Sequence, residues 1–122
     1  MIIGASNAAP NGEAYSGSTY VVFGTSDNDA IELSDIESGT GGFVINGAEA
    51  YNAIGNPVSA AGDFNGDGYD DVIIGASYAS PNGQSSGSTY VVYGTTSTNA
   101  IEISTLVPSG YGALINGADA GD

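Results

Sequence analysis

The sequence has no lysine, arginine, histidine, cysteine or tryptophan in its 122 residues, so its 14 acidic residues give a formal net charge of −14. Nucleic acid and anionic membrane surfaces are therefore very poor partners, because both are negatively charged. The absence of cysteine removes disulfides and zinc–thiolate sites from consideration but says little about the compartment. No apolar run approaches the roughly 20 residues of a transmembrane span, so we expect no membrane insertion. No secretion leader precedes Ile2, and we expect any export signal to lie outside these residues.

The same absences restrict catalysis. The chain can form no Ser–His or Cys–His pair, no Schiff-base lysine and no cationic clamp for phosphate. Glu32 and Glu102 could be read as a glycosidase carboxylate pair, but they occupy matching positions in a repeat and are flanked by apolar residues. We interpret them as the solvent face of outer strands. The sequence predicts no catalytic residue and no enzyme activity.

The most informative stretch is the loop from Asp63 to Asp71, which leads into an apolar run, Val72–Ala76. Gly68 stands at the sixth loop position, where a chain that wraps a cation turns sharply. Calcium takes about six to eight oxygen ligands in irregular geometry, whereas magnesium prefers a near-octahedral, partly hydrated site. The predicted calcium ligands are the side chains of Asp63, Asn65, Asp67 and Asp71, at positions one, three, five and nine, and the backbone carbonyl of Tyr69, at position seven.

Two other interpretations of this loop compete with the calcium site. A helix–loop–helix calcium site needs a glutamate at position twelve, but that place is held by Ile74 within the strand-like run. An ion-free hairpin turn is the remaining alternative, because Asn, Asp and Gly form such turns readily. We favour calcium, because four carboxylates within nine residues and no basic residue anywhere would repel one another without a cation between them.

The chain also contains an internal repeat. The segment 17–25 recurs as 87–95, an offset of 70 residues (87 minus 17), and 45–48 recurs as 115–118 at the same offset. Residues 2–6 match 73–77 at an offset of 71. Short β-rich runs separated by Gly, Asn, Ser and Pro predict an all-β array with little helix. The strands expected in the complete unit are 58–61, 71–76, 88–93 and 100–104, with a further short run at 113–116 that leads towards the next unit.

Four short strands per repeat favour a β-propeller blade. The segment 62–77 resembles the FG-GAP repeat of integrin alpha-chain propellers and related bacterial proteins, with Ile54-Gly55 in the place of "FG" and Gly75-Ala76-Ser77 in the place of "GAP". The resemblance implies a calcium site in the turn between the first two strands of a blade, held by the loop residues named above. It also implies all-β propeller blades, about two four-stranded antiparallel repeats.

We expect two units. Residues 1–52 would form a first, incomplete repeat without its calcium loop, and residues 53–122 a second repeat with an intact loop, followed by a truncated blade. Because a propeller closes with about four to eight blades, this chain would be either a slice of a larger propeller or a subunit whose copies complete one another by strand exchange as a homo-oligomer or fibre. Other blades, of the same or a neighbouring chain, are the expected partners.

The function predicted from these features is that of a calcium-binding, non-enzymatic propeller segment of a secreted or cell-surface protein, acting in adhesion, scaffolding or self-assembly. An extracellular protein or a glycan would be its ligand. The alternative is an accessory propeller of a secreted hydrolase or lyase whose catalytic residues lie outside this chain. The loop tyrosines Tyr15, Tyr51, Tyr78 and Tyr111 lie in Gly-, Ser- and Asn-rich connections and are candidates for a binding surface.

Overall fold

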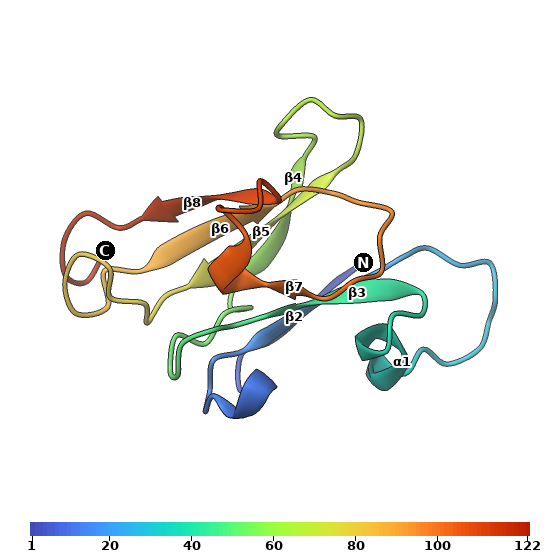
Figure 1. The fold of residues 1–122 in the computed structure, drawn as a ribbon, viewed down its shortest axis with the longest axis horizontal. Coiled ribbons are helices and arrows are strands. Elements are labelled where there is room, and N and C mark those ends of the chain that lie inside the picture. The colour runs from blue at the N-terminus through green and yellow to red at the C-terminus, as the bar shows by residue number, and fades with distance from the viewer.

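The computed structural model describes all 122 residues and consists of two four-stranded sheets with three short helical segments (Figure 1). The prediction of an all-β fold is confirmed. The strands are β1 (Ile2–Ala5), β2 (Ser18–Val22), β3 (Gly42–Asn46), β4 (Val58–Gly62), β5 (Asp71–Ala76), β6 (Ser88–Val92), β7 (Ile101–Glu102) and β8 (Gly112–Asn116). The helical segments are η1 (Pro10–Gly12), α1 (Leu33–Glu37) and η2 (Ile103–Thr105).

The repeat in the sequence is a repeat in the structure. The strand order is β1-β2-β3-β7 in the first sheet and β4-β5-β6-β8 in the second. β2 and β6 have the same sequence, Ser-Thr-Tyr-Val-Val, and both are central strands, as their β-branched and aromatic residues favour. They pair in the same register, since Ser18 lies opposite Asn46 and Ser88 lies opposite Asn116.

One expected strand was wrong. We predicted the fourth strand of the second unit at 100–104, but that place in the second sheet is taken by β8, antiparallel to β6. Residues 101–102 form β7, which instead lies parallel to β3 at the edge of the first sheet (Figure 1, orange beside teal). The second repeat thus contributes a strand to the first sheet, and this contact ties the two units together. The division at residue 52 stays a prediction.

The two sheets share one apolar core. Ten buried residues form it, and they come from both sheets, from the segment before β4, from the β5–β6 connection and from η2 with the residue that follows it. Four further buried residues, Tyr20, Val22, Ile36 and Val44, form a smaller cluster where α1 covers the first sheet. The larger core consists of Phe43, Ile45, Ile54, Val72, Ile74, Ala76, Ala79, Val92, Ile103 and Leu106.

The residues that carry the family resemblance contact one another. Ile54 is 1% exposed and lies in the shared core. The amide of Gly55 donates to the carbonyl of Gly75 at 3.1 Å, and the amide of Gly75 donates to the carbonyl of Pro57 at 2.8 Å. A Cβ at position 75 would lie 2.6 Å from Cδ of Pro57, so only glycine allows this close approach. The motif therefore fixes where the second sheet meets the first. None of the helices has the length and apolar character that a membrane crossing requires.

Candidate functional site

The loop between β4 and β5 extends away from the body of the molecule (Figure 1) and is organised by its own side chains. Both carboxylate oxygens of Asp63 accept backbone hydrogen bonds, from Asp67 at 2.9 Å and from Gly68 at 2.8 Å. Asn65 donates its amide to the Asp67 carboxylate at 3.1 Å. Gly66 and Gly68 adopt the left-handed φ values of 75° and 90° that this tight path requires. The structure thus brings Asp63, Asn65 and Asp67 together, as the sequence predicts.

Asp71 has a different place at the base of the loop. It is 1% exposed, and its carboxylate accepts backbone hydrogen bonds from Phe64 at 2.7 Å, Asn65 at 3.3 Å and Gly94 at 2.7 Å. These bonds connect the two ends of the loop to each other and to Gly94, two residues after the end of β6. Asp71 is therefore an anchor of the loop, because a buried carboxylate needs several donors to replace its lost hydration.

The loop fits a hard cation in its chemistry and only partly in its geometry. Its side chains offer oxygen ligands, as calcium prefers. Asp67 also accepts a hydrogen bond from the backbone amide of Tyr69 at 2.9 Å. No three acidic side chains lie close enough together to hold a metal ion. Asp63 and Asp67 share the loop interior through hydrogen bonds, while the carboxylate of Asp71 is engaged by amides at the base. Calcium binding and its ligand set stay a prediction.

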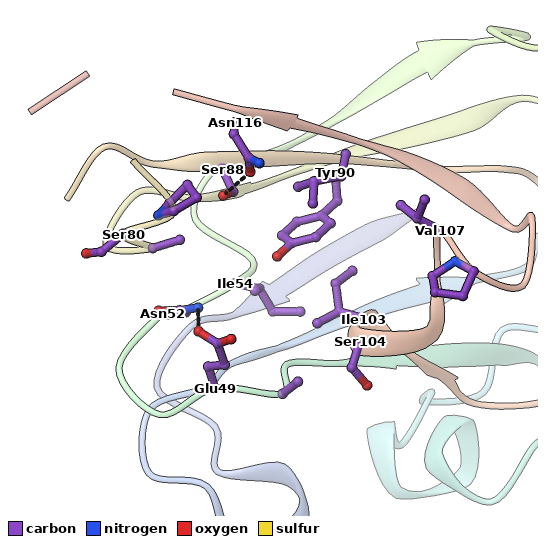
Figure 2. A pocket seen from close by; sticks show the side chains of 15 residues that line it. Glu49, Asn52, Ile54, Ser80, Ser88, Tyr90, Ile103, Ser104, Val107 and Asn116 are labelled. Carbon is purple, nitrogen blue, oxygen red and sulfur yellow. Dashed lines mark hydrogen bonds between the residues drawn. The ribbon is translucent and has the colours of Figure 1, made fainter. Parts of the chain in front are cut away.

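A second feature is a pocket of about 470 Å³ where the two repeats meet (Figure 2). Its wall is mixed, with the apolar residues Ile54, Ile103 and Leu114 among those that line it. Glu49 and Asn52 lie together at one side, where the Asn52 amide donates to the Glu49 carboxylate at 3.1 Å. The hydroxyl of Tyr90 points into the pocket without a hydrogen bond to the residues drawn around it.

The equivalent tyrosines of the two repeats, Tyr20 and Tyr90, have different surroundings. Tyr20 donates to the Glu37 carboxylate at 2.6 Å, and burial, this hydrogen bond and the charge of Glu37 raise the pKa of Tyr20 to about 12. The residue 70 positions after Glu37 is Val107, which cannot accept a hydrogen bond. Burial and, second, the charge of Glu49 raise the pKa of Tyr90. This difference between the repeats, which aligning them would have found, leaves Tyr90 without the carboxylate acceptor that Tyr20 has.

Of the two glutamates that we expected on the solvent face of outer strands, Glu102 lies on an edge strand and Glu32 lies on no strand. Glu32 is exposed and precedes α1. Glu102 lies on β7 at the contact between the repeats, where its carboxylate accepts the side-chain amides of Asn11 and Asn46, both at 3.1 Å. The prediction was wrong for Glu32, and for Glu102 it missed the partner sheet, because alternation of apolar and polar residues does not identify the strand that a segment pairs with. The side-chain partners of Glu102 are thus asparagines, and Glu32 is not one of them.

Comparison with known proteins agrees with the architecture. A family model described as FG-GAP repeat matches residues 53–92. Integrin alpha pat-2 of Caenorhabditis elegans is 50% identical over 48 residues, which cover 39% of this chain and 4% of the nematode protein. Integrin alpha pat-2 of Caenorhabditis briggsae is 48% identical over 48 residues, with the same coverage of 39% and 4%. The alignments thus span a small fraction of these relatives, and the bacterial type that we expected stays a prediction. Residues 53–92 are an FG-GAP repeat, and the two sheets of this chain have the form of FG-GAP propeller blades.

Proposed function

We propose that this chain is a calcium-stabilised, non-enzymatic segment of a β-propeller in a secreted or cell-surface protein, and that it acts in adhesion. The observation that carries this proposal is an FG-GAP repeat that contains an acidic loop, in a chain with 50% sequence identity to part of an integrin alpha chain over 48 residues. The proposal is about one segment only, since its relatives are far longer.

Calcium would act on this chain through folding. Asp63, Asn65 and Asp67 would supply side-chain oxygens, Tyr69 its carbonyl, and Asp71 would hold the loop while offering a further carboxylate. The ion would neutralise acids that no lysine or arginine balances. Because it binds the folded loop and not the unfolded chain, its binding free energy adds to the stability of the fold. A weak site would suffice outside the cell, where calcium is abundant.

The exposed edges of the two sheets support the proposal that this chain is a segment of a β-propeller. β1 and β7 are the edges of the first sheet, and β4 and β8 are the edges of the second. β8 carries two exposed apolar side chains, Leu114 at 42% and Ile115 at 56% exposure. Exposed apolar strands at a sheet edge favour contact with another blade. The partner that we propose for this face is a neighbouring blade of the same or another chain.

Thermal unfolding in calcium and in chelator tests the proposal. Calcium at ten times its dissociation constant should raise the free energy of unfolding by about 1.4 kcal/mol. Asp67→Ala should remove most of this difference, because Asp67 is a predicted ligand that the loop already holds by hydrogen bonds to Asn65. Asp70→Ala is the matched control, an exposed acid of the same loop at a position without a predicted ligand. A calcium-dependent shift that survives Asp67→Ala unchanged would contradict the ligand assignment.

A further inference from the structure

Three exposed tyrosines gather around one hollow at the end of the sheets. Tyr15, Tyr51 and Tyr78 are 52%, 65% and 63% exposed, and they line a depression of about 540 Å³. They come from three different connections, β1–β2, β3–β4 and β5–β6, so both repeats contribute. The rings of Tyr15 and Tyr51 are stacked, with their centroids 5.8 Å apart and their planes at 25°. We name these three residues the tyrosine platform.

The hollow has no charged lining residue in a chain with 14 acids. Its polar groups are amides and hydroxyls, each able to bond to a neutral hydroxyl group. Asn52 donates its amide to Glu49 at 3.1 Å, which fixes the side chain and leaves its carbonyl oxygen for another donor (Figure 2). Besides the platform, the lining residues are Asn7, Ala50, Asn52, Ala53, Ser80, Gln84 and Ser85.

The backbone around the platform is strained. The chain has five non-glycine residues with positive φ, and four of them, Tyr15, Tyr51, Ala53 and Ser85, line this hollow. Such residues cluster where the surrounding structure holds them for a function. Tyr51 has a φ of 66°, while Gly121, 70 positions later, has a φ of 84°. Glycine adopts this conformation without strain, so the tyrosine at position 51 adds a ring at a conformational cost.

Hydrogen bonds hold the strained segment in place. The amide of Tyr51 donates to the carbonyl of Ala14 at 2.9 Å, and the amide of Ala53 donates to the carbonyl of Tyr15 at 2.9 Å. On the other side, Ser80 donates its hydroxyl to the carbonyl of Tyr78 at 3.3 Å and accepts the amide of Ser85 at 3.0 Å. The platform is therefore fixed before any ligand arrives, which lowers the entropic cost of binding.

We propose that the tyrosine platform binds a neutral oligosaccharide. Tyrosine rings offer flat apolar faces to the C–H faces of a sugar ring, and the amides beside them can bond its hydroxyl groups. Sulfated, sialylated and uronic-acid glycans are excluded because the chain has no basic residue to meet their charge and repels them through its own. A cationic ligand would be drawn to a carboxylate, and none lines the hollow.

This inference deepens the proposed adhesive function by naming a ligand class, and it does not depend on the calcium loop. The test presents the protein, in millimolar calcium, to an array of neutral, sialylated and sulfated oligosaccharides, and then titrates the neutral oligosaccharide that binds best by calorimetry. Tyr51→Gly and Tyr78→Ala should each weaken binding by about tenfold or more, because each removes one ring of the platform.

Two comparisons make the result decisive. Tyr51→Gly should leave the melting temperature unchanged or raise it, since glycine relieves the strain at this position, so loss of binding cannot be assigned to misfolding. Tyr111→Ala is the matched control, a tyrosine with 60% exposure that precedes β8 and does not line the hollow, and this variant should bind like the unaltered protein. Binding of acidic glycans only, of peptides but no glycan, or of no glycan at all by the folded protein would overturn the inference. A failed calcium test with intact glycan binding would overturn the proposed calcium role alone.

Discussion

Ile45 and Ile115 occupy equivalent positions on β3 and β8, 70 residues apart, yet Ile45 is 0% exposed and Ile115 is 56% exposed. Ile45 is buried because the second sheet, η2 and the segment that carries Ile54 pack against the first sheet. No element of the chain covers Ile115 in the same way. The first repeat thus shows how a following blade would bury the face that the second repeat leaves exposed.

The two isoleucines should therefore differ in their effect on stability. Ile45→Ala should lower the free energy of unfolding by about 2–5 kcal/mol, because it leaves a cavity in the shared core. Ile115→Ala should change it by less than about 0.5 kcal/mol, because the side chain is exposed. Urea denaturation of the two variants measures both values. A large loss with Ile115→Ala would show that this face already contributes to the core and is not a free blade surface.

Asp71 should matter to the fold with or without calcium. Its carboxylate accepts three backbone hydrogen bonds while 1% exposed. Asp71→Ala leaves these buried donors unpaired and should cost about 3 kcal/mol or more. Most of this loss should persist in chelator, unlike that of Asp67→Ala, and in calcium it should be greater by the stabilisation that the ion supplies, because Asp71 is also a predicted ligand. Chemical denaturation in both conditions checks this, with Asp70→Ala as the control that should stay near the unaltered protein. An effect confined to calcium-containing buffer would contradict the anchoring role.

Much of the fold could be predicted because the repeat aligns strands of equal composition. The error at 100–104 has a physical cause. Ile103 and Leu106 are spaced by three, as are Leu33 and Ile36, and a short helical turn places such a pair on one side. In the structure Leu33 and Ile36 belong to α1, while Ile103 begins η2 and Leu106 follows its end. This spacing, present in both repeats, was the signal that alternation of Ile and Glu concealed.

The candidate site, like the fold, was predictable only in part. The clustering of Asp63, Asn65 and Asp67 was predictable because their hydrogen bonds arise within one loop, from spacing and two glycines. The contacts of Glu102 join residues that are 91 and 56 positions away in the chain. The tyrosine platform likewise depends on three connections meeting in space. Spacing along the chain does not show which distant segments contact one another, so these contacts could be identified only from the structure.

Glu102 should stabilise the contact between the repeats. Its carboxylate accepts amides from Asn11 and Asn46, whereas Glu32, at the equivalent position, is exposed and accepts none. Glu102→Ala should lower the free energy of unfolding by about 1 kcal/mol, since the pair of hydrogen bonds is partly open to water. Glu32→Ala should have an effect near zero. Thermal and urea unfolding of the two variants provide the comparison, and equal effects would contradict the assigned contact.

Tyr20 predicts how stability depends on pH in the alkaline range. Burial, the hydrogen bond to Glu37 and the charge of Glu37 raise its pKa to about 12. The unfolded tyrosine ionises near pH 10. Above that pH the unfolded chain loses a proton that the folded chain keeps, so stability falls as pH rises. The contribution is complete below pH 10 and is lost progressively up to about pH 12. Tyr20→Phe should flatten this part of the profile, and Tyr111→Phe, which removes an exposed hydroxyl, should not.

Unfolding between pH 8 and 12, followed with ultraviolet absorption of the tyrosinate, measures both effects. If the slopes for the Tyr20→Phe variant and the unaltered protein coincide, Glu37 does not hold the phenol protonated.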